Sequence, residues 1–177
     1  MKKFIFLDVD GVFNVQNYEE ARGVSSFMPI AVDHFNWLLS RHKDAKVIMT
    51  STWRDDVLNG NMNLTGMEVL LRSHGLKMQK RLIGVTPRDK EDDDRRENIR
   101  RGHRGQQIHS WLFHFAYGQE YAMCVIDDCP VGMDFKPYDD FVVNVSGHIG
   151  LTREDVEQAD ALLRLSPLEI IKKNAPL

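Results

Sequence analysis

Short apolar runs alternate with helix-like segments along the chain, and this alternation limits the fold more than any other feature. Each run is rich in β-branched or large apolar side chains. Such runs have the length and the composition of strands that are buried on both faces of a sheet. The predicted strands are FIFL (4–7), AKVIMT (45–50), RLIGV (81–85), AMCVI (122–126) and DFVVNV (140–145).

Helical patterns occupy the intervals between these runs. Residues 105–116, for example, place Ile108, Trp111, Leu112 and Phe115 at the i, i+3, i+4, i+7 spacing of one helix face. Strands that alternate with helices predict an α/β fold with a mainly parallel sheet. Two further helices are predicted over 29–42 and over 66–74, the second with Gly75 at its C-terminal end. Two more are predicted to follow the Thr152–Asp155 capping pair and Ser166–Pro167.

Length and composition are typical of an ordinary globular enzyme or binding protein. The chain has 177 residues, which predicts a single domain over 1–177. Its formal net charge is −3, so bulk charge indicates neither nucleic acid nor a membrane as a partner. Cys124 and Cys129 form no CxxC zinc pattern, and no apolar segment approaches the ~20 residues of a membrane span. We therefore expect a cytoplasmic protein with no membrane contact and no obligate protein partner.

One segment, residues 87–104, departs from the alternating pattern. Its sequence, PRDKEDDDRRENIRRGHR, is highly charged and almost free of apolar residues. We interpret it as a solvated, mobile loop. The alternative is a basic segment that faces the substrate, because it contains a cluster of arginines: Arg95, Arg96, Arg100, Arg101 and Arg104.

Polar side chains follow three of the predicted strands. In a parallel α/β sheet, ligands bind beyond the carboxyl ends of the strands, so these side chains would converge at one edge. Four carboxylates cannot gather without a counter-charge, because like charges at about 4 Å repel by roughly 4 kcal/mol. Mg²⁺ fits such a site; alternatively one carboxyl group is protonated, as a general acid requires, and both can hold at once. The side chains are Asp8 and Asp10, Thr50 and Ser51, and Asp127 and Asp128.

Each of these pairs alone is common at an ordinary strand end, but together and in this order they resemble the motifs of a known family. FLDVDGV, VIMTS, a basic residue before a helix, and VIDD are similar to the motifs of the haloacid dehalogenase (HAD) superfamily of phosphohydrolases. The resemblance extends over residues 4–165. It implies a Rossmann-like, three-layer fold and a reaction through an aspartyl-phosphate intermediate.

The resemblance also implies a role for each aspartate. Asp8 would be the nucleophile and a Mg²⁺ ligand, while Asp10 would protonate the leaving oxygen and then activate water. The backbone carbonyl of Asp10 would also contact Mg²⁺. Asp127 would be a further Mg²⁺ ligand, and Asp128 either another ligand or a neighbour of the ligands. The chemistry is reasonable, because a carboxylate can attack phosphorus and divide hydrolysis into two easier steps.

Other motif residues would contact the phosphate. By the same resemblance, Thr50 would donate a hydrogen bond to the phosphoryl group, a role that Ser51 could share or take. Arg104, which enters the third predicted helix, is our choice for the basic residue that steadies the charge on the nucleophile and on the phosphate. Arg101 and Lys90 are alternatives. An arginine would offer the phosphate a two-point geometry that a lysine cannot.

Gly11, Trp53 and Arg54 complete the predicted substrate site. Gly11 lets the backbone turn sharply directly after the DxD pair. Trp53 could stack on a base, and Arg54 could contact a phosphate. The alternative is that Trp53 packs in the core and that Arg54 caps a helix.

The intervals in which related phosphatases carry a cap domain are small here. Residues 12–44 and 105–121 leave room for little or no cap, and an open site favours a nucleic-acid end, a nucleotide or a protein as substrate. The combined motifs also resemble the phosphatase-like domains of RNA-repair proteins and, more distantly, those of polynucleotide kinase-phosphatases. We therefore predict a Mg²⁺-dependent phosphomonoesterase that acts on a nucleotide or a nucleic-acid end. The alternatives are a small-molecule phosphatase of broad specificity, covered by the 14–28 loop, and a non-catalytic binding module.

Overall fold

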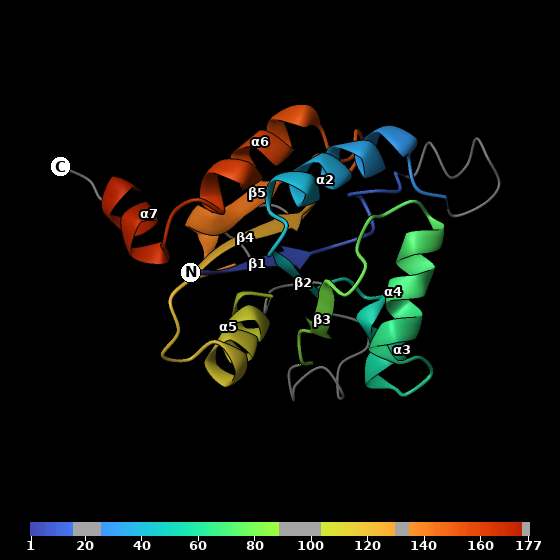
Figure 1. The fold of residues 1–177 in the computed structure, drawn as a ribbon, viewed down its shortest axis with the longest axis horizontal. Coiled ribbons are helices and arrows are strands. Elements are labelled where there is room, and N and C mark those ends of the chain that lie inside the picture. Colours follow the sequence, from blue (N-terminus) through green and yellow to red (C-terminus); the bar gives the residue numbers. More distant parts are fainter. Residues whose placement is uncertain (16–25, 89–103, 130–134, 175–177) are drawn as a thin grey trace.

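A computed structural model describes residues 1–15, 26–88, 104–129 and 135–174 of the chain, with side chains as far as residue 170. Within these ranges the strands form one parallel sheet in the order β3-β2-β1-β4-β5 (Figure 1). Every strand that the sequence predicts is confirmed, and so is the α/β fold. The strands are β1 (Lys2–Leu7), β2 (Lys46–Met49), β3 (Leu82–Val85), β4 (Tyr121–Asp127) and β5 (Val142–Asn144).

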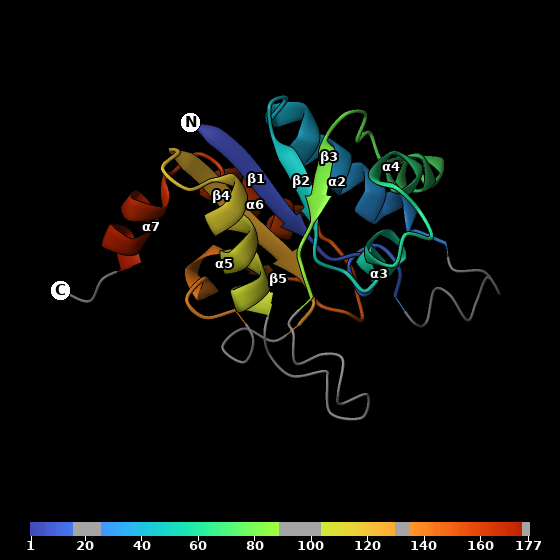
Figure 2. The same cartoon turned by 90° about the horizontal axis from the view of Figure 1, so that it is seen from below.

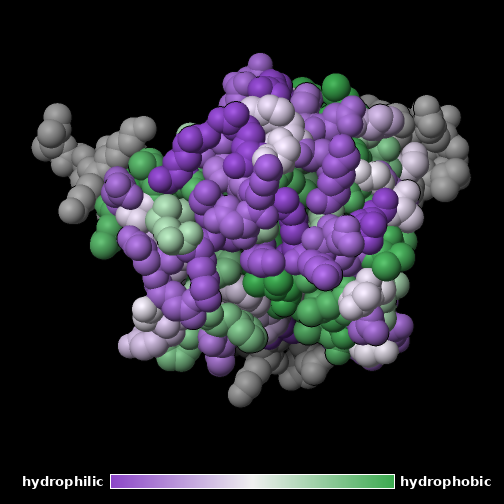
Figure 3. All heavy atoms as spheres, viewed as in Figure 1, coloured by the Kyte–Doolittle hydropathy of each residue, from purple (hydrophilic) through white to green (hydrophobic). Residues whose placement is uncertain are grey.

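Helices cover both faces of the sheet. They are α2 (Pro29–Arg41), α3 (Arg54–Leu58), α4 (Leu64–Ser73), α5 (Arg104–Phe115), α6 (Arg153–Leu162) and α7 (Pro167–Asn174), with a short 3-10 helix, η1 (Asp139–Phe141), before β5. Figures 1 and 2 show α2 and α6 side by side on one face and α5 on the other, which gives three layers. Hydrophilic side chains cover most of the surface over α2 and α6 (Figure 3). None of the helices in the described ranges has the length and apolarity that a membrane crossing requires.

The structure differs from the sequence prediction where local capping and turn chemistry decide the element ends. Helix α4 begins before residue 66, because the side chain of Asn63 caps it by accepting a hydrogen bond of 2.8 Å from the Gly66 N–H. Helix α3 is not predicted at all, since it is too short to show helical periodicity. Residues 139–141 form η1 rather than the start of a strand, in keeping with the poor strand propensity of aspartate.

Side chains of β1 alternate between two hydrophobic clusters, one on each face of the sheet. Ile5 and Leu7 pack with residues of α2, α4 and α6, whereas Phe4 and Phe6 pack with residues of α5. The Phe6 ring meets the Trp111 ring of α5 edge to face at 5.6 Å. Because the alternation has a period of two, the residue that follows Leu7 continues the α5-facing series.

The pairing register places the ends of three strands abreast. Leu7 of β1 pairs with Met49 of β2 and with Ile126 of β4. One residue further on, the Thr50 N–H donates to Leu7 O, and the N–H of Asp8, the residue after β1, donates to Ile126 O, both at 2.9 Å. The backbone hydrogen-bond ladder therefore continues for one residue past the ends of β1 and β2. The side chains of these next residues line one edge of the sheet.

Of the two intervals considered for a cap, 105–121 is fully described and 12–44 is described only in part. Between α5 and β4 the described chain holds no further element, as predicted. Residues 16–25 of the 14–28 loop and residues 89–103 of the charged 87–104 segment lie outside the described residues, so the predictions for those two segments stay predictions.

Candidate active site

Asp8 and Asp127 stand side by side at the carboxyl edge of the sheet, since the register pairs the residues that precede them. Both are buried, with 3% and 0% of their surface exposed. Arg104, the first residue of α5, reaches both: its Nη1 lies 3.0 Å from Asp8 Oδ2 and also forms an ion pair with Asp127 Oδ2. The structure thus brings a predicted nucleophile, a predicted metal ligand and the chosen basic residue into direct contact.

Helix α5 brings Arg104 close to Asp8 and Asp127 because the residue after Arg104 is a glycine, which has no side chain. Gly105 is buried, and a Cβ added there would lie 2.7 Å from the backbone oxygen of Phe135 and closer still to that of Lys136. The first turn of α5 therefore packs directly on the backbone of residues 135–136. Nothing in the sequence marks Gly105, because the segment that it contacts lies thirty residues along the chain.

Burial and mutual repulsion dominate the electrostatics of this group. Burial, and after it the charge of Asp8, raises the pKa of the Asp127 carboxyl to about 7, although Arg104 acts in the opposite direction. Burial also disfavours the Arg104 cation, but the charges of Asp127 and Asp8 outweigh this and raise the pKa of Arg104 above its ordinary value. Arg104 therefore stays charged, and it balances only part of the negative charge around it.

Asp128 lies at the same edge, held between two glycines. A Cβ added at Gly11 would overlap the Asp128 carboxylate, and one added at Gly147 would come within 2.7 Å of Asp128 Oδ2. Gly11 has a φ of 74°, in the left-handed region that favours glycine, which matches the sharp turn predicted after the DxD pair. Burial, followed by the charge of Asp8, raises the pKa of Asp128. The sequence marks Gly11 but not Gly147.

A divalent cation fits this group of carboxylates. Asp8, Asp127 and Asp128 each offer one oxygen, and these oxygens lie within 4.8 Å of one another. The three carboxylates carry three negative charges when all are ionised, and Arg104 carries one positive charge. Two negative charges are therefore left to balance. Carboxylate oxygens are the ligands that Mg²⁺ prefers, so the donor set suits the predicted cofactor.

The side chain of Asp10 belongs to a separate hydrogen-bonded group rather than to these three carboxylates. Its Oδ1 accepts hydrogen bonds from Asn14 Nδ2 at 2.9 Å and from Trp53 Nε1 at 3.1 Å. Its Oδ2 accepts one from the Thr52 hydroxyl at 3.4 Å. The sequence gives no sign of Asn14 or Thr52 as partners, because their approach depends on the turns that follow β1 and β2.

The two hydroxyls that follow β2 have different surroundings. Thr50 is buried beside Asp8, and its Oγ1 makes no hydrogen bond to any residue that the structure describes. Ser51 is also buried, but its Oγ accepts a hydrogen bond of 3.3 Å from the Trp53 backbone N–H. A buried hydroxyl without a partner is costly, so Thr50 is the better placed of the two to meet a ligand oxygen. Thr86 is likewise buried at the end of β3.

Trp53 packs in the core, as the alternative interpretation anticipates, whereas Arg54 contacts the chain just after β2 instead of capping a helix. The Trp53 ring packs against the core, with its centroid 5.7 Å from that of Phe27 and 6.4 Å from that of His74. Arg54, the first residue of α3, donates from Nη1 to the backbone oxygen of Thr50. Both side chains thus support the site from within the fold.

Other sequence-predicted residues of the site are not described. Arg101 and Lys90, the alternatives to Arg104, lie outside the described residues, as do Arg95, Arg96 and Arg100 of the charged segment. Among the basic residues considered for this role, Arg104 is the one that the structure describes and places on Asp8.

Comparison with known proteins adds one finding. A family model described as "HAD domain in Swiss Army Knife RNA repair proteins" matches residues 4–156. No curated protein and no solved structure matches the chain. The matched range runs from β1 into α6 and contains every side chain of the site described above.

Proposed function

Because the chain belongs to the family of HAD domains in Swiss Army Knife RNA repair proteins, we propose that it is a Mg²⁺-dependent phosphomonoesterase that forms an aspartyl-phosphate intermediate. The observation that carries this proposal is the arrangement at the sheet edge. There a buried carboxylate, Asp8, lies beside a guanidinium, two further carboxylates and a hydroxyl that has no hydrogen-bond partner among the described residues. A phosphate needs a nucleophile, hydrogen-bond donors and neutralising charge, and this edge offers all three.

Asp8 acts as the nucleophile in the proposed reaction. One of its oxygens attacks the phosphorus, a new O–P bond forms, and the bond from phosphorus to the ester oxygen breaks. The Val9 backbone N–H donates to Asp8 Oδ1 at 2.9 Å, and Arg104 pairs with Oδ2, so the carboxylate is held in one orientation. Holding the nucleophile in place removes part of the entropic barrier to attack.

Asp10 handles the proton in both steps. It gives a proton to the ester oxygen as that oxygen leaves, which avoids expelling an alkoxide. In the second step it takes a proton from a water molecule that attacks the phosphorus, and the O–P bond to Asp8 breaks. Inorganic phosphate leaves, and Asp10 is again protonated for the next cycle. Its place outside the group of three carboxylates leaves it available for this proton transfer.

Arg104 and Thr50 stabilise the charge of the transferred group. Both lie beside Asp8, and Arg104 can meet two phosphoryl oxygens at once through its planar guanidinium. The Thr50 hydroxyl would gain in the complex the hydrogen bond that it lacks among the described residues. Such preorganised donors often account for the largest part of catalysis.

Asp8, Asp127 and Asp128 would hold Mg²⁺. The bound ion would neutralise charge on the phosphoryl oxygens and help to orient the group for attack. It would also supply the positive charge that Arg104 alone does not provide for three carboxylates.

The substrate class that we propose is a phosphorylated nucleotide or nucleic-acid end, with a 3′-phosphate as the first choice. Two observations support it: the matched family is drawn from RNA repair proteins, and the described chain between α5 and β4 carries no cap. A site that the described part of the chain leaves uncovered in this interval can admit the end of a long polymer.

Turnover of three substrates tests the proposal: a 3′-phosphorylated oligonucleotide, a mononucleotide and a sugar phosphate. We expect phosphate release from the oligonucleotide to be the most efficient, to stop with EDTA and to return with Mg²⁺. Asp8→Asn should abolish turnover and leave the fold intact, whereas Asp44→Asn, at the other end of β2, should not. If the oligonucleotide is the poorest substrate, the proposed class is wrong; if turnover survives in Asp8→Asn, the covalent mechanism is wrong.

A further inference from the structure

The two oxygens of the Asp10 carboxylate have unequal surroundings. Oδ1 accepts from two donors, Asn14 Nδ2 and Trp53 Nε1, at 2.9 and 3.1 Å. Within the described ranges, Oδ2 has one longer contact, 3.4 Å, to the hydroxyl of Thr52, which is exposed. An indole N–H can only donate a hydrogen bond, whereas a hydroxyl can rotate and either donate or accept. Trp53 can therefore act only as a donor to Oδ1, whereas the hydrogen bond between Thr52 and Oδ2 can reverse its direction.

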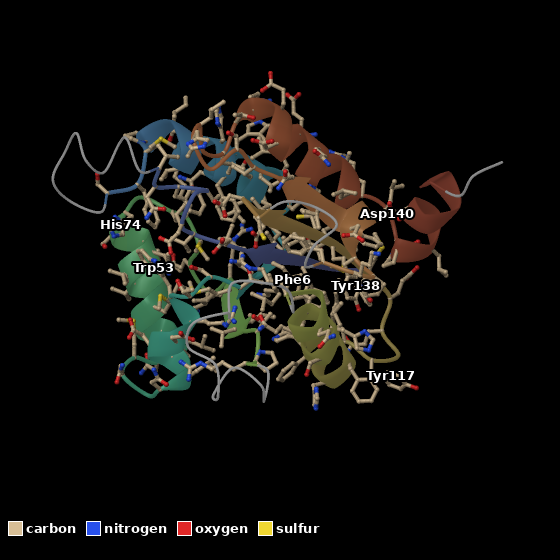
Figure 4. The ribbon with its side chains drawn as sticks, turned by 180° about the vertical axis from the view of Figure 1, so that it is seen from behind. Phe6, Trp53, His74, Tyr117, Tyr138 and Asp140 are labelled. Carbon is tan, nitrogen blue, oxygen red and sulfur yellow. The ribbon has the colours of Figure 1, made fainter. Side chains whose placement is uncertain are left out.

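Trp53 is held in a fixed position by its packing. Its ring lies against Phe27 and His74, and those two rings stack on each other with centroids 4.3 Å apart. Figure 4 shows Trp53 and His74 close together on the side of the sheet that carries α4. The Trp53 ring therefore contacts both the 26–28 segment and the residue that ends α4, and its N–H points at Asp10. A donor held in this way fixes the acceptor that it contacts.

We infer that Trp53 is a positioning residue, which together with Asn14 anchors Asp10 Oδ1 and thereby leaves Oδ2 as the oxygen that meets the leaving oxygen of the substrate. This inference rests on the proposed function, because it concerns the proton transfer assigned there to Asp10. It replaces base stacking as the role of the Trp53 side chain. It also assigns roles to Asn14 and Thr52, which the sequence alone does not connect with Asp10.

A positioning role for Trp53 predicts a kinetic effect that a purely structural role does not. A misplaced acid matters most when the leaving oxygen needs a proton. The alkoxide of a nucleoside 3′-phosphate needs one, whereas p-nitrophenolate leaves without it. Trp53→Phe keeps an aromatic ring for Phe27 and His74 but removes the donor to Asp10. We expect its kcat to fall for the nucleoside 3′-phosphate roughly tenfold more than for p-nitrophenyl phosphate, with KM unchanged.

Indole NMR tests the contact directly. The chain has three tryptophans, so the ¹⁵N spectrum has three indole signals, and Trp53→Phe identifies one of them. Asp10→Ala removes the acceptor. We expect this change to shift the Trp53 signal and speed its exchange with water, while the signals of Trp37 and Trp111 stay in place. An unmoved Trp53 signal would overturn the inference, whatever the enzyme does.

Kinetics with a matched control complete the test. Trp37 lies on α2 beneath the Arg153 guanidinium, 3.7 Å from its ring centroid, so Trp37→Phe removes an indole away from the site. This control should change neither substrate. Equal losses on both substrates in Trp53→Phe, or no loss, would refute the positioning role while the proposed function stands. Wild-type protein that hydrolyses neither substrate would refute the proposed function, and the inference would fall with it.

Discussion

Removal of the Arg104 guanidinium should destabilise the fold more than removal of any exposed arginine. In Arg104→Ala, Asp8 and Asp127 remain buried beside each other without their shared partner. Gly105 and the packing of α5 on residues 135–136 are unchanged, so the effect isolates the charge. Truncation of one partner in a buried ion pair leaves an uncompensated charge in a medium that solvates it poorly.

The magnitude follows from the distances at the site. Carboxylate oxygens of Asp8, Asp127 and Asp128 lie within 4.8 Å of one another, which corresponds to a repulsion of about 3.5 kcal/mol per ionised pair at an effective dielectric of 20. Loss of one partner of a buried ion pair typically costs about 3–5 kcal/mol. We therefore expect the free energy of unfolding in EDTA to fall by about 3–5 kcal/mol at a pH well above 7, where Asp127 is ionised. The loss should shrink at lower pH, because Asp127 then takes up a proton.

Urea unfolding, followed by circular dichroism with and without Mg²⁺, provides the assay. The matched control is Arg88→Ala: Arg88 also pairs with a carboxylate, that of Asp55 at 3.0 Å, but both side chains are well exposed, and the change should cost no more than about 1 kcal/mol. Mg²⁺ should restore part of the stability that Arg104→Ala loses. If Arg104→Ala is no less stable than Arg88→Ala in EDTA, the account of the buried charges is wrong.

Further predictions concern the glycine beside Asp128, a helix cap and a buried histidine. Gly147→Ala should weaken the apparent Mg²⁺ affinity roughly tenfold, since the new Cβ would displace Asp128 Oδ2; unchanged titration calorimetry would contradict this. Thr152→Ala breaks the capping box of α6 and should lower the unfolding free energy by about 1 kcal/mol in urea. Burial lowers the pKa of His42 below 6.5, so its contribution to stability is complete above pH 6.5 and is lost as the pH falls. His42→Gln should flatten the stability profile on the acid side; an unchanged slope would refute that assignment.

The sequence predicts the sheet and the row of polar residues at its edge for one physical reason. Strands buried on both faces are apolar almost throughout, so a carboxylate directly after such a run marks the strand end. Once the strands are parallel neighbours, Asp8 and Asp127 must meet at the same edge. The pairing of Asp8 with Thr50 follows from the same register.

The remaining features of the site depend on contacts between distant loops, which periodicity does not encode. Gly105 and Gly147 matter because separate segments approach them closely, and a single sequence does not show those approaches. The hydrogen bonds to Asp10 depend on how the chain turns after β1 and after β2 and on the orientation of the Trp53 ring. For the same reason the sequence could name Trp53 as part of the site but could not say which residue its indole contacts.

Direct capture of the phosphorylated enzyme is the measurement that tests the central claim most sharply. Wild-type protein would be mixed with a 3′-phosphorylated oligonucleotide and Mg²⁺, quenched in acid, reduced with borohydride and analysed by peptide mass spectrometry. An acyl phosphate on an aspartate is reduced to homoserine, and we predict that product at position 8 and nowhere else. Phosphate release by wild-type protein with Asp8 unmodified, or with homoserine at position 10, 127 or 128, would contradict the account.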